Sequence, residues 1–371
     1  MKYYIIAGEA SGDLHASNLM KALQREDAQA AFRFWGGDLM QAVGGTLVKH
    51  YKDRAFMGFA EVIANLRKIL GFIAFCKKDI AEYQPDHIIF IDNSGFNLRI
   101  AKWAKNEGFK TNYYISPQVW ASRAGRVEAI KRDIDAMYVI LPFEEAFYKK
   151  YNYTVNFVGH PLIDAIADRK QVSEKEFRKT HHLTEKPIIA LLPGSRKQEI
   201  KKMLSVMLKM IPKFTEYQFV IAGAPSQEYS FYKTFINETS IKFIDNRTYD
   251  LLSVSYAALV TSGTATLEAA LFKVPQVVCY KANNLSYQIA KRIVTLKFIS
   301  LVNLIMDREV VTELIQQDFN PKRVEQELNK ILNKEHREKL FLAYYELEKK
   351  LGGKGASAKA AKLIYNNGFV N

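Results

Sequence analysis

Short apolar segments, rich in β-branched and aromatic residues, alternate along the chain with longer segments whose apolar residues recur at helical spacing. Strands that read as continuous apolar runs are typical of parallel sheets covered by helices on both faces. The pattern therefore predicts an α/β protein. The predicted strands are 3–7, 32–35, 46–50, 87–91, 111–115, 137–141 and 155–158 in the first half of the chain, and 188–192, 218–222, 242–244, 257–260 and 276–279 in the second.

The alternation of strands and helices is interrupted by the polar, charge-rich segment 168–186. A chain of 371 residues is also too long for one ordinary hydrophobic core. We therefore predict two Rossmann-like domains, 1–168 and 187–320. A helical tail, 321–371, follows them and can pack back on the first domain or on a partner chain.

Composition indicates an anionic partner, because 53 Lys and Arg against 39 Asp and Glu give a net charge of +14. Nucleic acid, an anionic membrane surface or a phosphorylated small molecule would each satisfy this charge. The basic residues are dispersed rather than interleaved with aromatics in patches, which disfavours nucleic acid. The two cysteines lack metal-ligand spacing, and the sequence shows no signal peptide and no apolar run of membrane length. These features predict a cytoplasmic protein without metal or cofactor.

A Ser-Gly-Thr turn, formed by Ser262, Gly263 and Thr264, follows a predicted strand and opens a helix. Its small residues let a ligand approach the backbone, and the free N–H groups of a helix start attract an anion. Glu268, in the first turns of that helix, can accept hydrogen bonds from sugar hydroxyls. A diphosphate joined to a ribose needs both features. The alternative is an ordinary turn with a solvated glutamate.

A second turn suited to anions, Gly194, Ser195 and Arg196, follows the predicted strand 188–192. The turn frees backbone N–H groups, and a guanidinium offers permanent donors in a geometry that matches phosphate. Arg196 could instead pair with Glu199 on the helix surface, which would be a weak interaction. We favour phosphate binding.

The loop after the first strand contains Glu9, Ser11, Gly12 and Asp13 but lacks the G-x-G-x-x-G spacing of a dinucleotide site. Its acidic residues make it a poor cradle for pyrophosphate and suit it to the hydroxyls of a sugar. Asp13 could instead be a first-turn acid that the helix dipole favours.

Two more candidates follow predicted strands. Asp92 ends the strand 87–91 and can act as a general base, although it could also cap the next helix, as Asn93 or Ser94 could. His160 could donate to a substrate oxygen or act as a base, and could equally be a structural histidine between the domains.

An apolar stripe at helical spacing, with basic flanks, runs through residues 57–78. Such a stripe is usually core, yet its excess of apolar residues also fits a helix in a membrane interface or a port for acyl chains. The membrane or acyl candidates are Met57, Phe59, Val62, Leu66, Ile69 and Phe72.

The order of several short motifs resembles the lipid-A-disaccharide synthase family, inverting glycosyltransferases of family 19 with the GT-B fold. The motifs are residues 7–13, 91–92 with 95–97, 116–121, 141–144, 159–161, 191–196, 262–268 and 300–304. The resemblance covers nearly the whole chain. It implies two Rossmann-like domains that face each other across a cleft.

The resemblance also implies a reaction: 2,3-diacylglucosamine passes from its UDP derivative to the 6-hydroxyl of 2,3-diacylglucosamine 1-phosphate. The products are a β-1,6-linked disaccharide phosphate and UDP. Asn303 would line the donor site, Glu9 and Ser11 would help bind a glucosamine, and Arg196 with helix dipoles would replace a metal. Asp92, Glu9 and His160 all stay candidates for the general base. A peripheral position on the cytoplasmic face of the inner membrane and a homodimer are further expectations.

The chain departs from the family pattern at Ser94, Gly95, Ser122 and Val302. These departures put local loop shape and acyl-chain preference in doubt. The alternative function is that of a GT-B relative acting on a soluble UDP-sugar, either a 2-epimerase or a peptidoglycan-type transferase.

Overall fold

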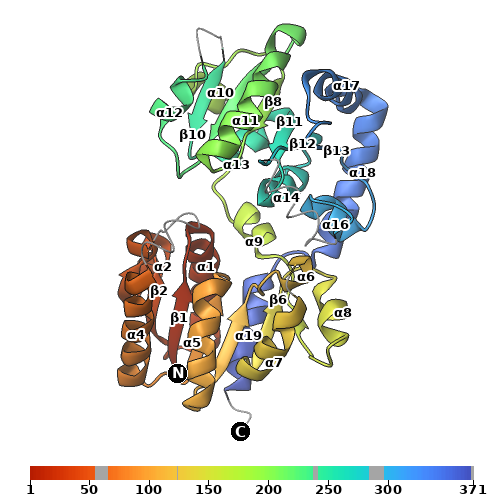
Figure 1. The fold of residues 1–371 in the computed structure, drawn as a ribbon. Coiled ribbons are helices and arrows are strands. Elements are labelled where there is room, and N and C mark those ends of the chain that lie inside the picture. The colour runs from red at the N-terminus through yellow and green to blue at the C-terminus, as the bar shows by residue number, and fades with distance from the viewer. Residues whose placement is uncertain (55–65, 123, 237–240, 284–295, 369–371) are drawn as a thin grey trace. The chain divides into compact units, whose positions relative to one another are not determined.

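A computed structural model describes residues 1–54, 66–122, 124–236, 241–283 and 296–368. The chain forms two compact units, each built around its own sheet. Unit 1 comprises Met1–Ala167 and Leu351–Asn371, and unit 2 comprises Asp168–Lys350. The chain therefore returns to unit 1 after it completes unit 2 (Figure 1).

Unit 1 contains a seven-stranded sheet with the order β3-β2-β1-β4-β5-β6-β7, in which every neighbouring pair is parallel. Its strands all match predicted ones to within two residues at either end. They are β1 (Lys2–Ala7), β2 (Ala31–Gly36), β3 (Thr46–His50), β4 (His87–Ile91), β5 (Thr111–Tyr114), β6 (Ala136–Val139) and β7 (Asn156–Phe157).

Helices cover both faces of this sheet. They are α1 (Ala10–Glu26), α2 (Asp38–Val43), α4 (Leu66–Tyr83), α5 (Ser94–Asn106), α6 (Val119–Ser122), α7 (Val127–Asp133), α8 (Glu144–Lys149), α9 (Pro161–Ala167) and α19 (Ala356–Asn367). Successive residues of β1 point to opposite faces, so Tyr3 and Ile5 pack with α1 and α19 while Tyr4 and Ile6 pack with α4 and α5. Burial on both faces explains why the central strands β1 and β4 are almost wholly apolar.

The last helix, α19, lies against α1 in unit 1 (Figure 1). Its buried face carries the small residues Ala356, Ala360 and Ala361 together with Ile364. Small side chains let the two helices approach closely. The end of the chain thus completes the core of the unit in which the chain begins.

Unit 2 contains a six-stranded parallel sheet with the order β10-β9-β8-β11-β12-β13. The strands are β8 (Ile188–Leu192), β9 (Gln218–Gly223), β10 (Lys242–Asp245), β11 (Ser255–Thr261), β12 (Gln276–Tyr280) and β13 (Glu313–Ile315). The last of these was not predicted. It is only three residues long and begins with a glutamate, so it lacks the apolar run that identified the others.

The helices of unit 2 pack around this sheet. They are α10 (Glu174–Thr180), α11 (Lys197–Met207), α12 (Tyr229–Lys233), α13 (Thr248–Ser253), α14 (Thr264–Leu271), α16 (Leu301–Met306), α17 (Pro321–Leu332) and α18 (Lys334–Lys350). Most of the predicted tail therefore belongs to unit 2. Arg337 of α18, for example, donates to the carbonyl oxygen of Tyr256 at 2.6 Å.

Both sheets reverse their strand order once. In unit 1 the chain moves outward from β1 to β3 and then continues on the other side at β4; in unit 2 the same reversal separates β8 from β11. Ligands of open parallel sheets bind beyond the carboxyl ends of the strands at such a switch point. The predicted site residues that follow β1, β4, β8 and β11 therefore all lie at the two switch points.

Candidate active site

The Ser262–Thr264 turn of unit 2 has the geometry of an anion-binding turn. Gly263 has a φ of 152°, a backbone conformation that only glycine adopts readily, and it precedes the first residue of α14. Both Gly263 and Thr264 are exposed, so a ligand can reach the backbone. The hydroxyl of Ser262 donates to the carbonyl oxygen of Ile299 at 2.8 Å, which fixes the turn against a neighbouring segment.

Glu268 follows one turn into α14 and is half-buried. Desolvation raises the pKa of its carboxyl to about 7, against an opposing hydrogen bond from Tyr249, whose hydroxyl lies 3.3 Å from Oε1. A carboxylate with spare acceptor capacity in this position can bind a pair of sugar hydroxyls. Tyr249, on α13, gave no signal in the sequence.

The second turn lies beside the first, because Leu192 at the end of β8 is paired with Val260 near the end of β11. Gly194 has a φ of 102°, and a Cβ there would lie 2.2 Å from Oε2 of Glu199. The same carboxylate accepts from the Ser195 N–H at 3.1 Å. The Ser195 N–H is therefore bonded to the Glu199 carboxylate and is not free for an anion, as the sequence had predicted it to be.

Arg196 is exposed at the start of α11. Across the described part of the chain no ion pair joins its guanidinium to Glu199. The weak surface pair considered from the sequence is thus absent there. Arg196 belongs to the turn after β8, and its exposed side chain is accessible to an anion.

Asn303 has a structural environment that the sequence did not suggest. Its side chain is fully buried; Nδ2 donates to the carbonyl oxygen of Val311 at 2.8 Å and to Oε1 of Glu313 at 2.9 Å. Its Oδ1 accepts from the N–H groups of Val310 and Val311 at 2.7 and 3.0 Å. All four hydrogen-bonding positions are therefore used within unit 2.

In unit 1, Asp92 and Glu9 lie together at the switch point, because Ala7 of β1 is paired with Ile91 of β4. Asp92 has a φ of 44°, in the left-handed region, and its side chain is exposed. Desolvation by the surrounding atoms raises the pKa of the Asp92 carboxyl, and the negative charge of Glu9 raises it further. A carboxylate with a raised pKa is a better proton acceptor. The approach of Gly8 to the Asn93 side chain leaves no room for a Cβ.

The rest of the loop after β1 divides into exposed and buried parts. Ser11 is exposed, whereas Gly12 is buried against Ala7, where a Cβ would lie 3.3 Å from its side chain. Asp13 is also buried. Its carboxylate accepts from the backbone N–H groups of Gly37, Leu39 and Met40, at 2.8, 3.0 and 3.1 Å respectively. Asp13 therefore caps the start of α2, which accounts for the residue without a substrate.

His160 is buried at the start of α9. Its Nδ1 accepts from the N–H of Leu162 at 3.2 Å, and its own backbone N–H donates to the carbonyl oxygen of Leu351 at 3.0 Å. Burial, together with the nearby His15, lowers the pKa of its imidazole to about 3. The ring is therefore neutral, and the backbone N–H of His160 joins the two chain segments that build unit 1.

Glu144, the last residue of the motif 141–144, is a buried acid at the same edge of the sheet and was not among the predicted site residues. It accepts from the N–H groups of Leu141 and Ile140, at 2.8 and 3.2 Å, and from the hydroxyl of Ser116. Burial raises the pKa of its carboxyl to about 7, against the opposing hydrogen bonds. An acid just beyond the end of a predicted strand was the signal that could have identified it.

Part of the predicted membrane or acyl segment, namely Met57, Phe59 and Val62, lies outside the described residues, and so does the side chain of Leu66. Ile69 and Phe72 of α4 are partly buried against the core of unit 1. The helix nevertheless exposes other large apolar side chains: 53% of Leu70 and 48% of Phe75 are accessible to solvent. Within the described residues, no helix is long and apolar enough to cross a bilayer.

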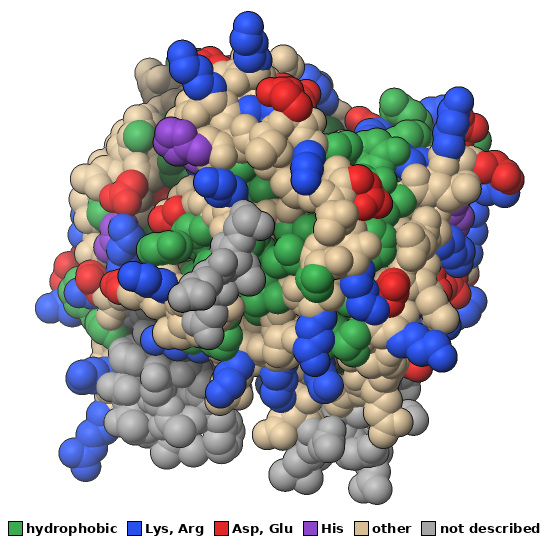
Figure 2. Space-filling view, turned by 90° about the horizontal axis from the view of Figure 1, so that it is seen from above, with side chains coloured by type: hydrophobic (Ala, Val, Ile, Leu, Met, Phe, Trp, Pro, Cys, Tyr) green, Lys and Arg blue, Asp and Glu red, His purple; other side chains and the backbone are tan. Residues whose placement is uncertain are grey.

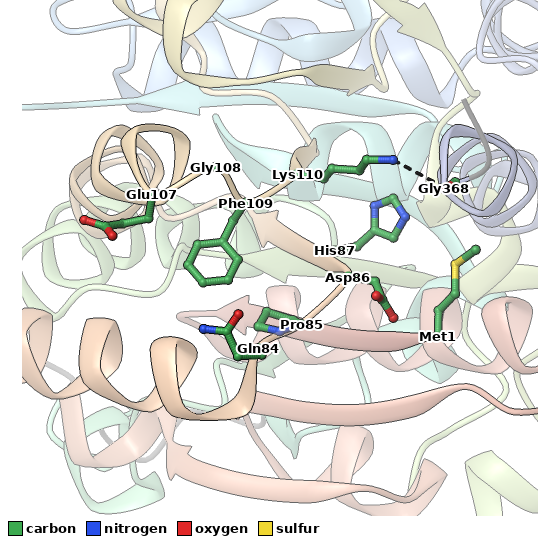
Figure 3. Close-up of a pocket in the computed structure, with 10 residues that line it drawn as sticks. All are labelled: Met1, Gln84, Pro85, Asp86, His87, Glu107, Gly108, Phe109, Lys110 and Gly368. Carbon is green, nitrogen blue, oxygen red and sulfur yellow. Dashed lines mark hydrogen bonds between the residues drawn. The ribbon is translucent and has the colours of Figure 1, made fainter. Parts of the chain in front are cut away.

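A cavity of about 400 Å³ lies at the opposite, amino edge of the unit 1 sheet (Figure 3). Its lining includes His87 and Lys110, whose amine donates to the carbonyl oxygen of Gly368 at 3.3 Å. None of the predicted site residues lines it. Because ligands of parallel sheets bind at the carboxyl edge, we place the active site at the switch points and not in this cavity.

On the face that Figure 2 shows, the basic charge is distributed rather than concentrated. Figure 2 shows Lys and Arg side chains spread over the whole visible face, with Asp and Glu among them. A phosphorylated small molecule or an anionic surface therefore fits the net charge of +14 better than a continuous nucleic-acid track does.

Comparison with known proteins gives the family. Residues 3–364 match the protein-family model described as lipid-A-disaccharide synthetase. The lipid-A-disaccharide synthase of Syntrophus aciditrophicus is 40% identical over 366 residues, which cover 96% of this chain and 95% of that protein. The corresponding protein of Coxiella burnetii is 37% identical over 368 residues, with coverage of 98% and 97%.

Among solved structures, a UDP-GlcNAc 2-epimerase from Neisseria meningitidis bound to UDP-GlcNAc is similar over 100% of both chains, with a TM-score of 0.68. Its sequence identity of 11% means that this likeness shows the fold alone. The fold is the two-sheet GT-B arrangement. Together with the nearly full-length match in sequence, it establishes that the chain belongs to the lipid-A-disaccharide synthase family, glycosyltransferases of lipid A biosynthesis.

Proposed function

We propose that the protein transfers 2,3-diacylglucosamine from UDP-2,3-diacylglucosamine to the 6-hydroxyl of 2,3-diacylglucosamine 1-phosphate, with inversion at the anomeric carbon. The products are the β-1,6-linked disaccharide 1-phosphate and UDP. One observation carries this proposal beyond family membership. The switch point of unit 1 presents an acid with a raised pKa, and that of unit 2 presents the exposed Ser262–Thr264 turn next to the turn that carries Arg196.

Asp92 acts as the general base in this scheme. Its carboxylate takes the proton of the acceptor's 6-hydroxyl as that oxygen forms a bond to the anomeric carbon. The raised pKa of Asp92 strengthens its carboxylate as a proton acceptor. Glu9 contributes negative charge next to the base and, together with Ser11, binds hydroxyls of a glucosamine.

Unit 2 holds the leaving group. As the bond from the anomeric carbon to the diphosphate oxygen breaks, negative charge grows on UDP. Arg196, the Ser262–Thr264 turn and the first N–H groups of α14 stabilise this charge electrostatically. Glu268 accepts hydrogen bonds from the ribose hydroxyls. The chain's own donors therefore supply what the departing diphosphate requires.

The remaining predicted residues act through the backbone. Gly12 permits close packing of the loop after β1, Asp13 holds α2, His160 joins the segments of unit 1, and Asn303 holds the loop before β13. In our proposal these residues keep the edges of the two sheets in shape for substrate, rather than contacting the reacting atoms.

We also propose that the protein works at the cytoplasmic face of the inner membrane, where acylated substrates reside. The exposed Leu70 and Phe75 of α4, close in sequence to the exposed Arg67 and Lys68, support this. Apolar groups with basic neighbours suit the interface of an anionic bilayer. A homodimer stays a prediction.

The proposal is tested by incubating the full chain with both acylated substrates and measuring UDP release and disaccharide formation. The same assay with unacylated UDP-GlcNAc, as donor or for epimerisation, tests the alternative of a soluble UDP-sugar. Turnover confined to the unacylated sugar would make this alternative correct.

Arg196→Ala is expected to weaken UDP binding by one to two orders of magnitude, because a charge-assisted contact to phosphate contributes about 1.5–3 kcal/mol. Isothermal titration with UDP measures the effect. Lys201→Ala removes another exposed cation from α11 and serves as the control, with an expected change below about twofold. Equal losses in the two variants would mean that only net charge matters.

The affinity for UDP is expected to fall as pH decreases below about 7. The pKa of Glu268 is raised to about 7, so below that pH the carboxyl is protonated and loses acceptor capacity for the ribose. The loss can approach tenfold per pH unit if only the ionised form binds. In Glu268→Gln this side chain no longer titrates, whereas the phosphates of UDP still do. A pH dependence that is identical in both proteins would exclude Glu268 from the ribose site.

A further inference from the structure

Glu313, the first residue of β13, organises the segment beside the Ser262–Thr264 turn. Its Oε2 accepts from the N–H of Ile299 at 2.9 Å, and its Oε1 accepts from the N–H of Ser300 at 2.9 Å. Oε1 also accepts from Nδ2 of Asn303 at 2.9 Å. One carboxylate thus receives three donors from residues 299–303.

This segment is bonded directly to the turn proposed to hold the diphosphate. The carbonyl oxygen of Ile299 accepts from the Ser262 hydroxyl at 2.8 Å, while the N–H of Ile299 donates to Glu313. Ile299 is therefore held on both sides, by Ser262 through its carbonyl and by Glu313 through its N–H. A shift of the carboxylate would be transmitted to the turn through this single residue.

The network is closed at its other end. The hydroxyl of Ser300 accepts from the N–H of Asn303 and caps α16, and the side chain of Asn303 fixes Val310 and Val311 just before β13. The two oxygens of the Glu313 carboxylate together accept all three donors. Glu313 is thus the one member whose replacement would release the whole segment.

We propose that Glu313 is a positioning residue of the nucleotide site, holding Ile299 so that the Ser262–Thr264 turn keeps its geometry for the UDP diphosphate. This inference rests on the proposed function, since it takes UDP to be the ligand of that turn. Glu313 does not touch the nucleotide. It acts through Ile299 and Ser262, and its own charge is satisfied by backbone and amide donors.

The isosteric variant Glu313→Gln tests this selectively. Its single carbonyl oxygen can keep the Ser300 and Asn303 donors, but its amide nitrogen then faces the N–H of Ile299 and cannot accept from it. We expect about five- to tenfold weaker binding of UDP by isothermal titration, with the fold retained. Glu313→Ala, which loses all three contacts, should weaken binding more. Glu309→Gln, an exposed acid on the same stretch of chain, should bind UDP as the wild type does.

A double-mutant cycle separates positioning from a general structural role. In a Ser262→Ala background the link to Ile299 is already cut, so Glu313→Gln should then change UDP affinity by less than about twofold. Additive effects would overturn the proposed route. A lower melting temperature with unchanged UDP affinity in Glu313→Gln would show a purely structural role and overturn the inference alone. If the wild type itself fails to bind UDP, both the proposed function and this inference are wrong. If Glu313→Ala does not fold, Glu313→Gln and the double-mutant cycle still test whether Glu313 positions the turn.

Discussion

Replacing Asp92 with asparagine is expected to lower kcat for disaccharide formation by about 10²- to 10⁴-fold, the usual contribution of a general base. Asparagine keeps the size of the side chain and tolerates the left-handed backbone at this position, where φ is 44°. The variant therefore removes the proton acceptor with little change in shape. UDP affinity should be unchanged, because the groups proposed to bind UDP all belong to unit 2.

Glu9→Gln provides the matched comparison. The charge of Glu9 helps to raise the pKa of Asp92, so removing it should lower that pKa and move the acidic limb of the pH–rate profile to lower pH. The loss of maximal rate should be much smaller than in Asp92→Asn. If Glu9→Gln abolishes turnover while Asp92→Asn retains it, Glu9 is the base and the assignment must be exchanged. If neither variant loses rate, neither acid is the general base and the proposed scheme is wrong.

Replacing Asp79 with alanine is expected to destabilise unit 1 by about 2–4 kcal/mol. Asp79 anchors α4 to the sheet: the hydroxyl of Tyr4 donates to it at 2.7 Å, and the Arg33 guanidinium binds it through two nitrogens. The Trp35 indole in turn donates to the Tyr4 hydroxyl at 2.8 Å. Alanine leaves these donors without their carboxylate. Because Arg33 is partly exposed, the loss should stay below that of a fully buried pair.

Urea unfolding followed by tryptophan fluorescence measures this effect, since all three tryptophans, Trp35, Trp103 and Trp120, lie in unit 1. Glu82→Ala removes an exposed ion pair from the same helix and should cost less than about 0.5 kcal/mol. Burial alone would raise the pKa of Asp79, but hydrogen bonds from Arg33 and Tyr4 hold it below its usual value. Its contribution is therefore present at neutral pH and is lost as pH falls through the lowered pKa. An Asp79→Ala penalty that persists in acid would contradict this account.

The sequence predicted the strands well because burial on both faces leaves a local signature that needs no knowledge of neighbours. β4 and β8 were predicted at their observed bounds. Strand β13 escaped because it is short and its first side chain is charged. The path of the tail could not be predicted from the sequence. The helical periodicity of 356–367 indicates that one face of the helix is buried, but it does not indicate in which unit.

For the candidate site, the sequence placed acids, glycines and an arginine after the correct strands, and strand order then brought them together in pairs. It could not tell which polar side chains have protein partners. The side chains of Asp13 and Asn303 accept hydrogen bonds from backbone N–H groups that come close to them only after folding. Glu144 lies in the motif 141–144, but its environment depends on Ser116, and those of Tyr249 and Glu313 depend on Glu268 and Ile299, contacts that form only in the folded chain.

The most direct measurement is a single reaction, in which the wild-type chain is supplied with UDP-2,3-diacylglucosamine and 2,3-diacylglucosamine 1-phosphate. The account predicts UDP and disaccharide in equal amounts, with a β configuration at the new linkage and almost no product from Asp92→Asn. Retention of the α configuration, absence of UDP release, or full activity of the Asp92 variant would contradict it.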